Sequence, residues 1–242
     1  MAGNYLNINP LLFSIPIMLF IVAFVLLLYY TYARSVRLQH QLRNRYLTNL
    51  EEERKRISRE LHDTMSVFSI SFKNYIHQHQ AIATSEKEAW QEQIINFEKN
   101  IQDINELLYP IELKHGNVYS ALERLSMLLS KSGKTLRLHN QCTNFQMPPQ
   151  SAIHIYRILQ ESVVNVFKHT ENKELILNLF EEEQQLHAVL SYASIEKKTS
   201  YTLDKARRGQ HILEERLLII NGSRSRSWEE GIIFEKFKFG NL

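Results

Sequence analysis

The stretch IINFEKNIQDINELLYPI, residues Ile94–Ile111, holds the clearest periodic pattern in this chain of 242 residues. Its apolar residues alternate in steps of three and four, which is the heptad spacing of a helix with one apolar seam. The seam residues are Ile94, Phe97, Ile101, Ile104, Leu108 and Ile111. Because proline cannot continue a helix, Pro110 predicts where this helix ends. The stretch therefore predicts a long helix that needs a partner along its seam.

The preceding segment, residues 33–80, supplies a candidate partner helix. It contains neither proline nor glycine, and it carries a second apolar stripe at helical spacing. The stripe consists of Leu50, Ile57, Leu61, Phe68, Phe72 and Tyr75. A hairpin of the two helices buries half of each seam, and two hairpins that dimerise into a four-helix bundle bury all of it. A coiled-coil spacer fits the periodicity equally well, so the spacing alone leaves both readings open.

Further toward the N-terminus lies LLFSIPIMLFIVAFVLLLYY, residues 11–30, without a charged residue. Twenty apolar residues in a helix span the hydrocarbon core of a bilayer. A cleaved signal peptide is less favoured, because no Lys or Arg precedes the run and no small-residue cleavage site follows it. Arginines follow the run directly, so the positive-inside rule predicts a cytoplasmic C-terminal part. We expect residues 1–10 to be a short extracytoplasmic N-terminus and residues 11–32 to be a transmembrane helix.

The pattern changes after Gly116, where shorter helical and alternating segments follow one another. Expected helices cover residues 118–129, 152–169 and 210–220, and expected strands cover residues 135–140, 175–180, 186–192 and 231–239. Helices with hairpin-paired strands predict a helix layer on a mixed sheet, an α/β sandwich. The expected fold class is thus α plus α/β: a transmembrane helix, a helical hairpin over residues 33–115 that forms a dimeric four-helix bundle, and a sandwich domain over residues 116–242.

Composition excludes several classes of protein. A hydrophobic content of 44% is too high for a disordered chain, and a single cysteine, Cys142, excludes a disulfide scaffold. The basic run Arg224–Ser227 is short, and we interpret it as a solvated turn rather than a nucleic-acid contact. His77 and His79 are two residues apart and would point to different faces of a helix, which argues against a metal site.

The stretch ERKRISRELHD, residues 53–63, carries the first candidate chemistry. His62 follows the seam residue Leu61, which predicts a partly exposed position on the flank of the bundle. Asp63 can accept a hydrogen bond from one ring nitrogen, which leaves the other nitrogen as a nucleophile. This arrangement suits phosphoryl transfer onto histidine, whereas an isolated pair of this kind would more often be part of a solvated helix face.

The same eleven residues closely resemble the phosphoacceptor box of sensor histidine kinases of the NarX/DesK-like subfamily. The resemblance implies a subgroup 3 dimerisation and phosphoacceptor domain, followed by an ATPase domain of the GHKL (Bergerat) type. It implies that His62 is phosphorylated and that Asp63 assists as base or hydrogen-bond acceptor. It also implies a homodimer that passes the phosphoryl group to the receiver domain of a response regulator.

A second motif, LQESVVNVFKH at residues 159–169, resembles the N-box of the same family. The spacing places Glu161, Asn165, Lys168 and His169 on one helix face. The resemblance implies that this face lines an ATP site, with Mg²⁺ held by the carbonyl oxygen of Asn165. Lys168 and His169 would face the phosphates. The resemblance covers roughly residues 37–239.

The chain departs from the family pattern at the adenine-binding box, D-x-G-x-G. Tyr192 stands at the aspartate position, and Ser194 and Glu196 stand at the two glycine positions. The following lid keeps one of its glycines, Gly209, as a cofactor-binding candidate. On the acceptor helix, Val67 stands where members with phosphatase activity often have glutamine, so phosphatase activity by that route is not expected.

These observations predict a single-pass sensor histidine kinase of the bacterial cytoplasmic membrane, with its C-terminal part in the cytoplasm. It would phosphorylate His62 from ATP with Mg²⁺, act as a homodimer, and donate to a response regulator, without a nucleic-acid partner. The alternative is a catalytically degenerate, nucleotide-blind scaffold or phosphoacceptor, which the departures around Tyr192 favour. A plain coiled-coil adaptor remains the third reading.

Overall fold

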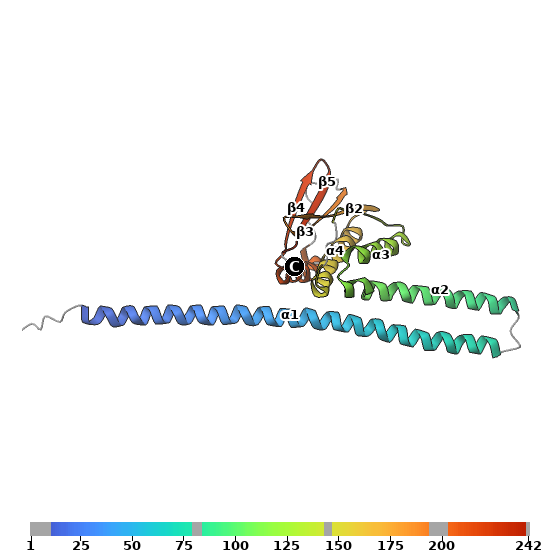
Figure 1. The fold of residues 1–242 in the computed structure, drawn as a ribbon, viewed down its shortest axis with the longest axis horizontal. Helices are drawn as coiled ribbons and strands as arrows, with labels where there is room; N and C mark the ends of the chain where they lie inside the picture. Colours follow the sequence, from blue (N-terminus) through green and yellow to red (C-terminus); the bar gives the residue numbers. More distant parts are fainter. Residues whose placement is uncertain (1–10, 79–83, 143–146, 194–202, 241–242) are drawn as a thin grey trace, which may run out of the picture. The chain divides into compact units, whose positions relative to one another are not determined.

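The computed structural model describes residues 11–78, 84–142, 147–193 and 203–240, with side chains for all of these except 11–15, 84 and 203–210. The chain divides into two units, residues 1–49 and 50–242. The helices are α1 (Leu11–Gln78), α2 (Thr84–Leu108), η1 (Ile111–His115, a 3₁₀ helix), α3 (Val118–Ser130), α4 (Pro149–His169) and α5 (Leu203–Ile219). The strands are β1 (Thr135–Asn140), β2 (Glu174–Glu182), β3 (Gln185–Ala193), β4 (Ser223–Glu229) and β5 (Ile232–Lys238), as Figure 1 shows.

The first unit contains the N-terminal part of α1, which is apolar on every described face. The helix Pro16–Gln78 includes an 18-residue window with a mean hydropathy of 2.1, and no part of that window is buried. A helix that is apolar all round and unburied matches a bilayer rather than a protein core. By length and composition, this one described helix can cross a membrane, and the bounds 11–32 stay a prediction.

In the second unit, the rest of α1 pairs with α2 as the expected helical hairpin. Aromatic rings join the two helices, with Phe68 against Phe97 at 6.2 Å between centroids and Phe72 against Trp90 at 5.5 Å. The apolar seam of α2 is only partly buried in this hairpin. Ile94 is buried, whereas Phe97 remains about half exposed. The hairpin therefore leaves apolar surface that a second copy could cover.

The α/β part is built on a five-stranded mixed sheet in the order β1-β2-β3-β5-β4. β1 and β2 run parallel, and every other neighbouring pair is antiparallel. Alternate residues of β2 and β3 are buried, as a sheet with one covered face requires. Helices α3, α4 and α5 supply the facing core residues, among them Leu122, Ile155, Leu159 and Leu213. The expected α/β sandwich is confirmed.

Turn chemistry fixes the ends of several elements. Gly116 follows η1 in the left-handed region, with φ of 72°, and a Cβ there would lie 2.2 Å from the carbonyl oxygen of Met147. Only glycine fits such a position, so Gly116 sets the passage from the hairpin into the α/β part. Glu183 and Gln184, both with positive φ, form the two-residue turn between β2 and β3.

Three sequence expectations need correction. The run Arg224–Ser227 is not a solvated turn but lies in the edge strand β4, paired with β5. Helix α4 begins at Pro149, three residues before the expected start, because proline suits the first turn of a helix. Helix α5 begins at Leu203, seven residues before the expected start.

Candidate functional site

His62 lies on α1 beside a groove of about 490 Å³. Its side chain is 74% exposed, more than the sequence predicted, because only its neighbour Leu61 turns toward the hairpin. The groove is lined from α1, α2, η1 and α3, with contributions from Ser66, Asn105 and Arg124. An exposed imidazole beside a polar groove is accessible to a second molecule from outside the helix.

Asp63 meets the ring of His62 as the spacing predicted. The Nδ1 atom of His62 lies 3.4 Å from Oδ1 of Asp63, which is a long contact that orients the ring. If the proton sits on Nδ1, the Nε2 atom carries the free lone pair. Ser66 donates from its hydroxyl to the carbonyl oxygen of His62 at 2.9 Å. The pair thus places a carboxylate beside one ring nitrogen of an exposed histidine.

The polar face of α4 is also formed as expected. The Nδ2 atom of Asn165 donates to Oε1 of Glu161 at 3.0 Å, which orients the amide and leaves its Oδ1 atom to accept. Lys168 and His169 are exposed in the last turn of the helix. A carboxylate and an amide carbonyl are ligand types that Mg²⁺ prefers, and two basic groups next to them suit phosphate. These residues fit the metal and phosphate part of a nucleotide.

The residue at the adenine-acceptor position does not fit that role. Tyr192 is buried at the end of β3, and its hydroxyl lies 3.2 Å from Oε1 of Glu235 and 3.0 Å from Nη2 of Arg226. Glu235 is 1% exposed, and its carboxylate is held by Arg226 and by Arg224, the latter at 3.0 Å. The phenol and the carboxylate are therefore engaged within the protein. Of the other candidates, Ser194 and Glu196 lie outside the described residues, and Gly209 lies in the part of α5 that is described by its backbone only.

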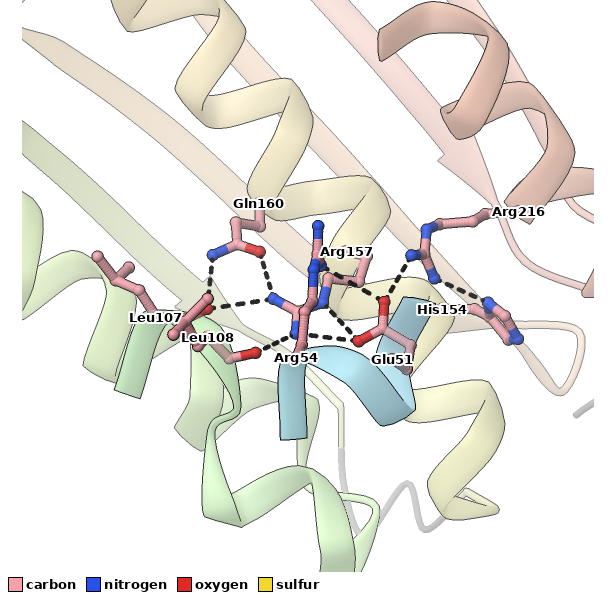
Figure 2. A network of polar contacts seen from close by, with 8 residues as sticks. All are labelled: Glu51, Arg54, Leu107, Leu108, His154, Arg157, Gln160 and Arg216. Atoms are coloured by element: carbon pink, nitrogen blue, oxygen red, sulfur yellow. Dashed lines mark hydrogen bonds and ion pairs between the residues drawn. The ribbon is translucent and has the colours of Figure 1, made fainter. Parts of the chain in front are cut away.

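The structure shows a second polar cluster that sequence reasoning missed, centred on Glu51 of α1 (Figure 2). Its Oε2 atom accepts from Arg157 of α4 at 3.1 and 3.0 Å, and its Oε1 atom accepts from Arg216 of α5 at 2.5 Å. Arg54, one turn along α1, lies 3.4 Å from the same carboxylate. One buried acid thus joins three helices. We call these four residues the Glu51 cluster.

Further contacts extend the Glu51 cluster. Arg157 also donates to the carbonyl oxygens of Leu107 and Leu108 at 3.2 and 2.5 Å, and so caps the C-terminal end of α2. Arg216 lies 3.2 Å from Nδ1 of His154, which must be unprotonated to accept. The sequence signal for this cluster was Arg157, a charged residue among the apolar positions of α4, but nothing in one sequence identifies its partner.

Charge and burial act together on the titratable groups of this cluster. Burial raises the pKa of the Glu51 carboxyl, but the charges of Arg157, Arg216 and Arg54 outweigh burial and hold that pKa below its ordinary value. Burial, and then the charge of Arg216, lower the pKa of His154 to about 4. At neutral pH Glu51 is therefore ionised, and His154, which lies beside the cluster, is neutral.

Comparison with known proteins shows homology to sensor proteins. The chain is 31% identical over 147 residues to the sensor protein VraS of Staphylococcus saprophyticus and 28% identical to that of Staphylococcus aureus, in both cases over 57% of this chain and 41% of the relative. The chain thus spans about two fifths of the length of these curated relatives. No family model matches the chain. Among solved structures, the histidine kinase AdeS of Acinetobacter baumannii is matched with a TM-score of 0.43 at 10% identity, over 71% of this chain and 94% of that one.

Proposed function

We propose that the chain is a sensor histidine kinase whose phosphoacceptor is His62. The observation that carries the proposal is the exposed imidazole of His62 with its Nδ1 atom against Asp63. Homology to the VraS sensor proteins supports it, as does the intact Glu161–Asn165 pair. The finer assignment to a NarX/DesK-like subfamily rests on the residues of the phosphoacceptor box alone.

The proposed reaction uses residues from two helices, the polar face of α4 for the nucleotide and His62 with Asp63 on α1 for the attack. ATP with Mg²⁺ would supply the phosphoryl group at the polar face of α4, where Asn165 and Glu161 offer oxygen ligands. His62 would attack the γ-phosphorus of ATP through Nε2, the bond from that phosphorus to the β–γ bridging oxygen would break, and ADP would leave. Asp63 would hold the opposite side of the ring and stabilise the charge that develops there. Lys168 and His169 would neutralise phosphate charge.

Partners and location follow as parts of the same proposal. The half-exposed seam of the hairpin, including Phe97 and Ile104, supports a homodimer that closes a four-helix bundle. The groove beside His62 would receive the receiver domain of a response regulator. The apolar part of α1 would anchor the protein in the cytoplasmic membrane, with the basic segment after it and the α/β part in the cytoplasm.

A labelling experiment tests the kinase. The full chain in lipid nanodiscs is incubated with γ-labelled ATP and Mg²⁺, and acid-labile label on the protein is measured. We expect label on the wild type, its complete loss in His62→Gln, and its retention in His77→Gln, an exposed histidine of the same helix. Label that persists in His62→Gln would contradict the assignment of the acceptor.

One observation favours a second candidate function. The closed contacts among Tyr192, Glu235 and Arg226 occupy the position of the adenine acceptor, which supports a nucleotide-blind scaffold or an acceptor that another kinase phosphorylates. Titration calorimetry with ATP distinguishes the two. An absence of both label and binding heat from the wild type would favour this second candidate.

A further inference from the structure

The Glu51 cluster joins parts of the chain that are distant in sequence. Arg157 and Arg216 lie 106 and 165 residues from Glu51, and their side chains are only 5% and 3% exposed. Both belong to helices of the α/β part, whereas Glu51 and the capped end of α2 belong to the hairpin. The cluster is therefore the polar centre of the contact by which the α/β part sits on the hairpin.

The composition of this cluster makes the contact sensitive to a single charge. Within the cluster one carboxylate contacts three guanidinium groups. The negative charge of Glu161 on α4 also acts on Arg54 and Arg216. Glu51 is nevertheless the carboxylate that pairs with them directly. Burial lowers the pKa of Arg216, and the charge of Arg157 adds to this effect, whereas Glu51 opposes it. Desolvation of buried ion pairs cancels much of their attraction, so such a contact is weakly favourable when complete and strongly unfavourable when one partner is lost.

The position of this cluster bears on the proposed reaction. Arg157 precedes Glu161 by one helical turn and Asn165 by two, so the cluster holds the start of the polar face of α4. Glu51 lies eleven residues before His62 on α1, or roughly 16 Å along the helix axis. The groove at His62 is lined from α1, α2, η1 and α3. In this arrangement α4 is anchored at Glu51, about three turns away from the nucleophile.

We propose that the Glu51 cluster is a latch that holds the α/β part docked on the hairpin and keeps the polar face of α4 away from His62. Opening the latch frees that face to approach the imidazole. The docking itself is independent of any nucleotide, whereas its consequence for His62 rests on the proposed kinase function. The latch is thus an autoinhibitory contact that a shift of α1 against α4 and α5 would release.

Hydrogen–deuterium exchange of the full chain in nanodiscs, without nucleotide, tests the docking. In Glu51→Gln the shape of the side chain is kept while the counter-charge of two buried arginines is lost. We expect the opening equilibrium, measured by exchange in residues 50–58 and 104–108, to rise by about 100-fold. The matched control Glu52→Gln removes an exposed carboxylate from the next position and should leave exchange unchanged. Equal exchange in the two variants would overturn the latch.

A charge exchange separates the ion pair from a general loss of stability. Glu51→Arg places a fourth cation in the cluster and should open the contact further. Combining it with Arg157→Glu restores one acid among three cations, the balance of the wild type, so exchange in residues 50–58 should fall back toward the wild-type rate. A double variant as open as the single variant would show that the ion pair does not hold the contact.

Labelling of His62 provides the functional readout. With label present on the wild type, we expect the initial rate in Glu51→Gln to rise at least severalfold, and an unchanged or lower rate would overturn the autoinhibitory role. If wild type and variant both stay unlabelled while exchange responds as expected, the docking role of the latch is supported and the kinase proposal fails. The two failures are therefore distinguishable.

Discussion

Glu51 and Glu235 are both buried carboxylates, and each is held by two arginines from other helices or strands, yet the two clusters join very different lengths of chain. The arginines at Glu51 come from α4 and α5, 106 and 165 residues away. Those at Glu235 come from the neighbouring strand β4, 9 and 11 residues away. The same chemistry thus serves a contact between two parts of the molecule in one case and a single β-hairpin in the other.

This difference determines what each cluster can stabilise. The cluster at Glu235 forms together with the β4–β5 pairing, in which Arg226 faces Glu235 directly, so its loss weakens the sheet itself. The hydrophobic core of the α/β part contains no residue of α1 or α2, so we expect loss of the Glu51 cluster to change docking rather than that core. The number of residues between the partners of a buried ion pair therefore indicates what the pair stabilises. Partners close in sequence stabilise the local fold, whereas distant partners can stabilise the docking of one part on another.

The largest effect on folding is expected from Glu235→Gln. Without the carboxylate, Arg224 and Arg226 lose their shared partner, and the hydroxyl of Tyr192 loses an acceptor. We expect the free energy of unfolding of the α/β part to fall by about 3 kcal/mol, because one partner of a buried ion pair is removed. Urea unfolding of the full chain, followed by amide exchange in β3 and β5, measures this change.

A control variant and a comparison with Glu51→Gln use the same two measurements, urea unfolding and amide exchange. Glu229→Gln removes an exposed carboxylate from β4 and should change stability by less than about 0.5 kcal/mol. Glu235→Gln should leave exchange in residues 50–58 of α1 close to wild type under native conditions. If Glu235→Gln instead opened α1 as Glu51→Gln is expected to do, the two clusters would not act separately.

The elements that the sequence predicted are those whose patterns arise from apolar burial. The alternation in β2 and β3 was read correctly because each strand buries one apolar face, and the helical spacing of α2 was read correctly although Phe97 and Ile104 of its seam remain exposed. Strand β4, SRSRSWE, was missed because its inward positions carry arginines rather than apolar side chains. The signal lay in its partner: Glu235 stands between Ile233 and Phe237 on the inward face of β5, where an acid requires a cation opposite.

The candidate site was predictable to a similar extent. Spacing brought Glu161 to Asn165 and His62 to Asp63, because both pairs are local on a helix. The Glu51 cluster could not be predicted from the sequence. A charged residue at an apolar position, Arg157, indicates that an acidic partner exists, but which residue this is depends on how two parts of the chain pack. Long-range polar contacts are set by tertiary packing, which a single sequence does not specify.

A pH dependence of docking is the next largest expected effect. His154 faces Arg216 from α5 and Glu51 from α1, with Arg157 on its own helix. Its pKa is about 4 when docked and 6.5 ordinarily, so its contribution is complete above pH 6.5 and is lost as the pH falls toward 4. The pKa of Glu51 lies below its ordinary 4.5, so the contribution of Glu51 is complete above pH 4.5 and begins to fall only below that pH.

We therefore expect the opening equilibrium of the wild type to rise by about tenfold between pH 7 and pH 5.5. Amide exchange in residues 50–58, corrected for the intrinsic rate at each pH, measures it. His154→Gln cannot be protonated and should show a flat profile over the same range. A wild-type profile as flat as that of the variant would contradict the charge relation between His154 and Arg216.

The smallest effect is expected at Lys131, whose Nζ atom lies 2.6 and 2.5 Å from the carboxylate oxygens of Asp103. This pair also joins the α/β part to the hairpin, from the residue that follows α3 to α2, but Lys131 is 46% exposed and Asp103 is 23% exposed. Exposed ion pairs contribute about 0–1 kcal/mol, because water already solvates both charges. Lys131→Gln should therefore change exchange in residues 50–58 by less than about threefold, against about 100-fold for Glu51→Gln. Equal opening by the two variants would mean that burial does not distinguish the Glu51 cluster from an ordinary surface contact.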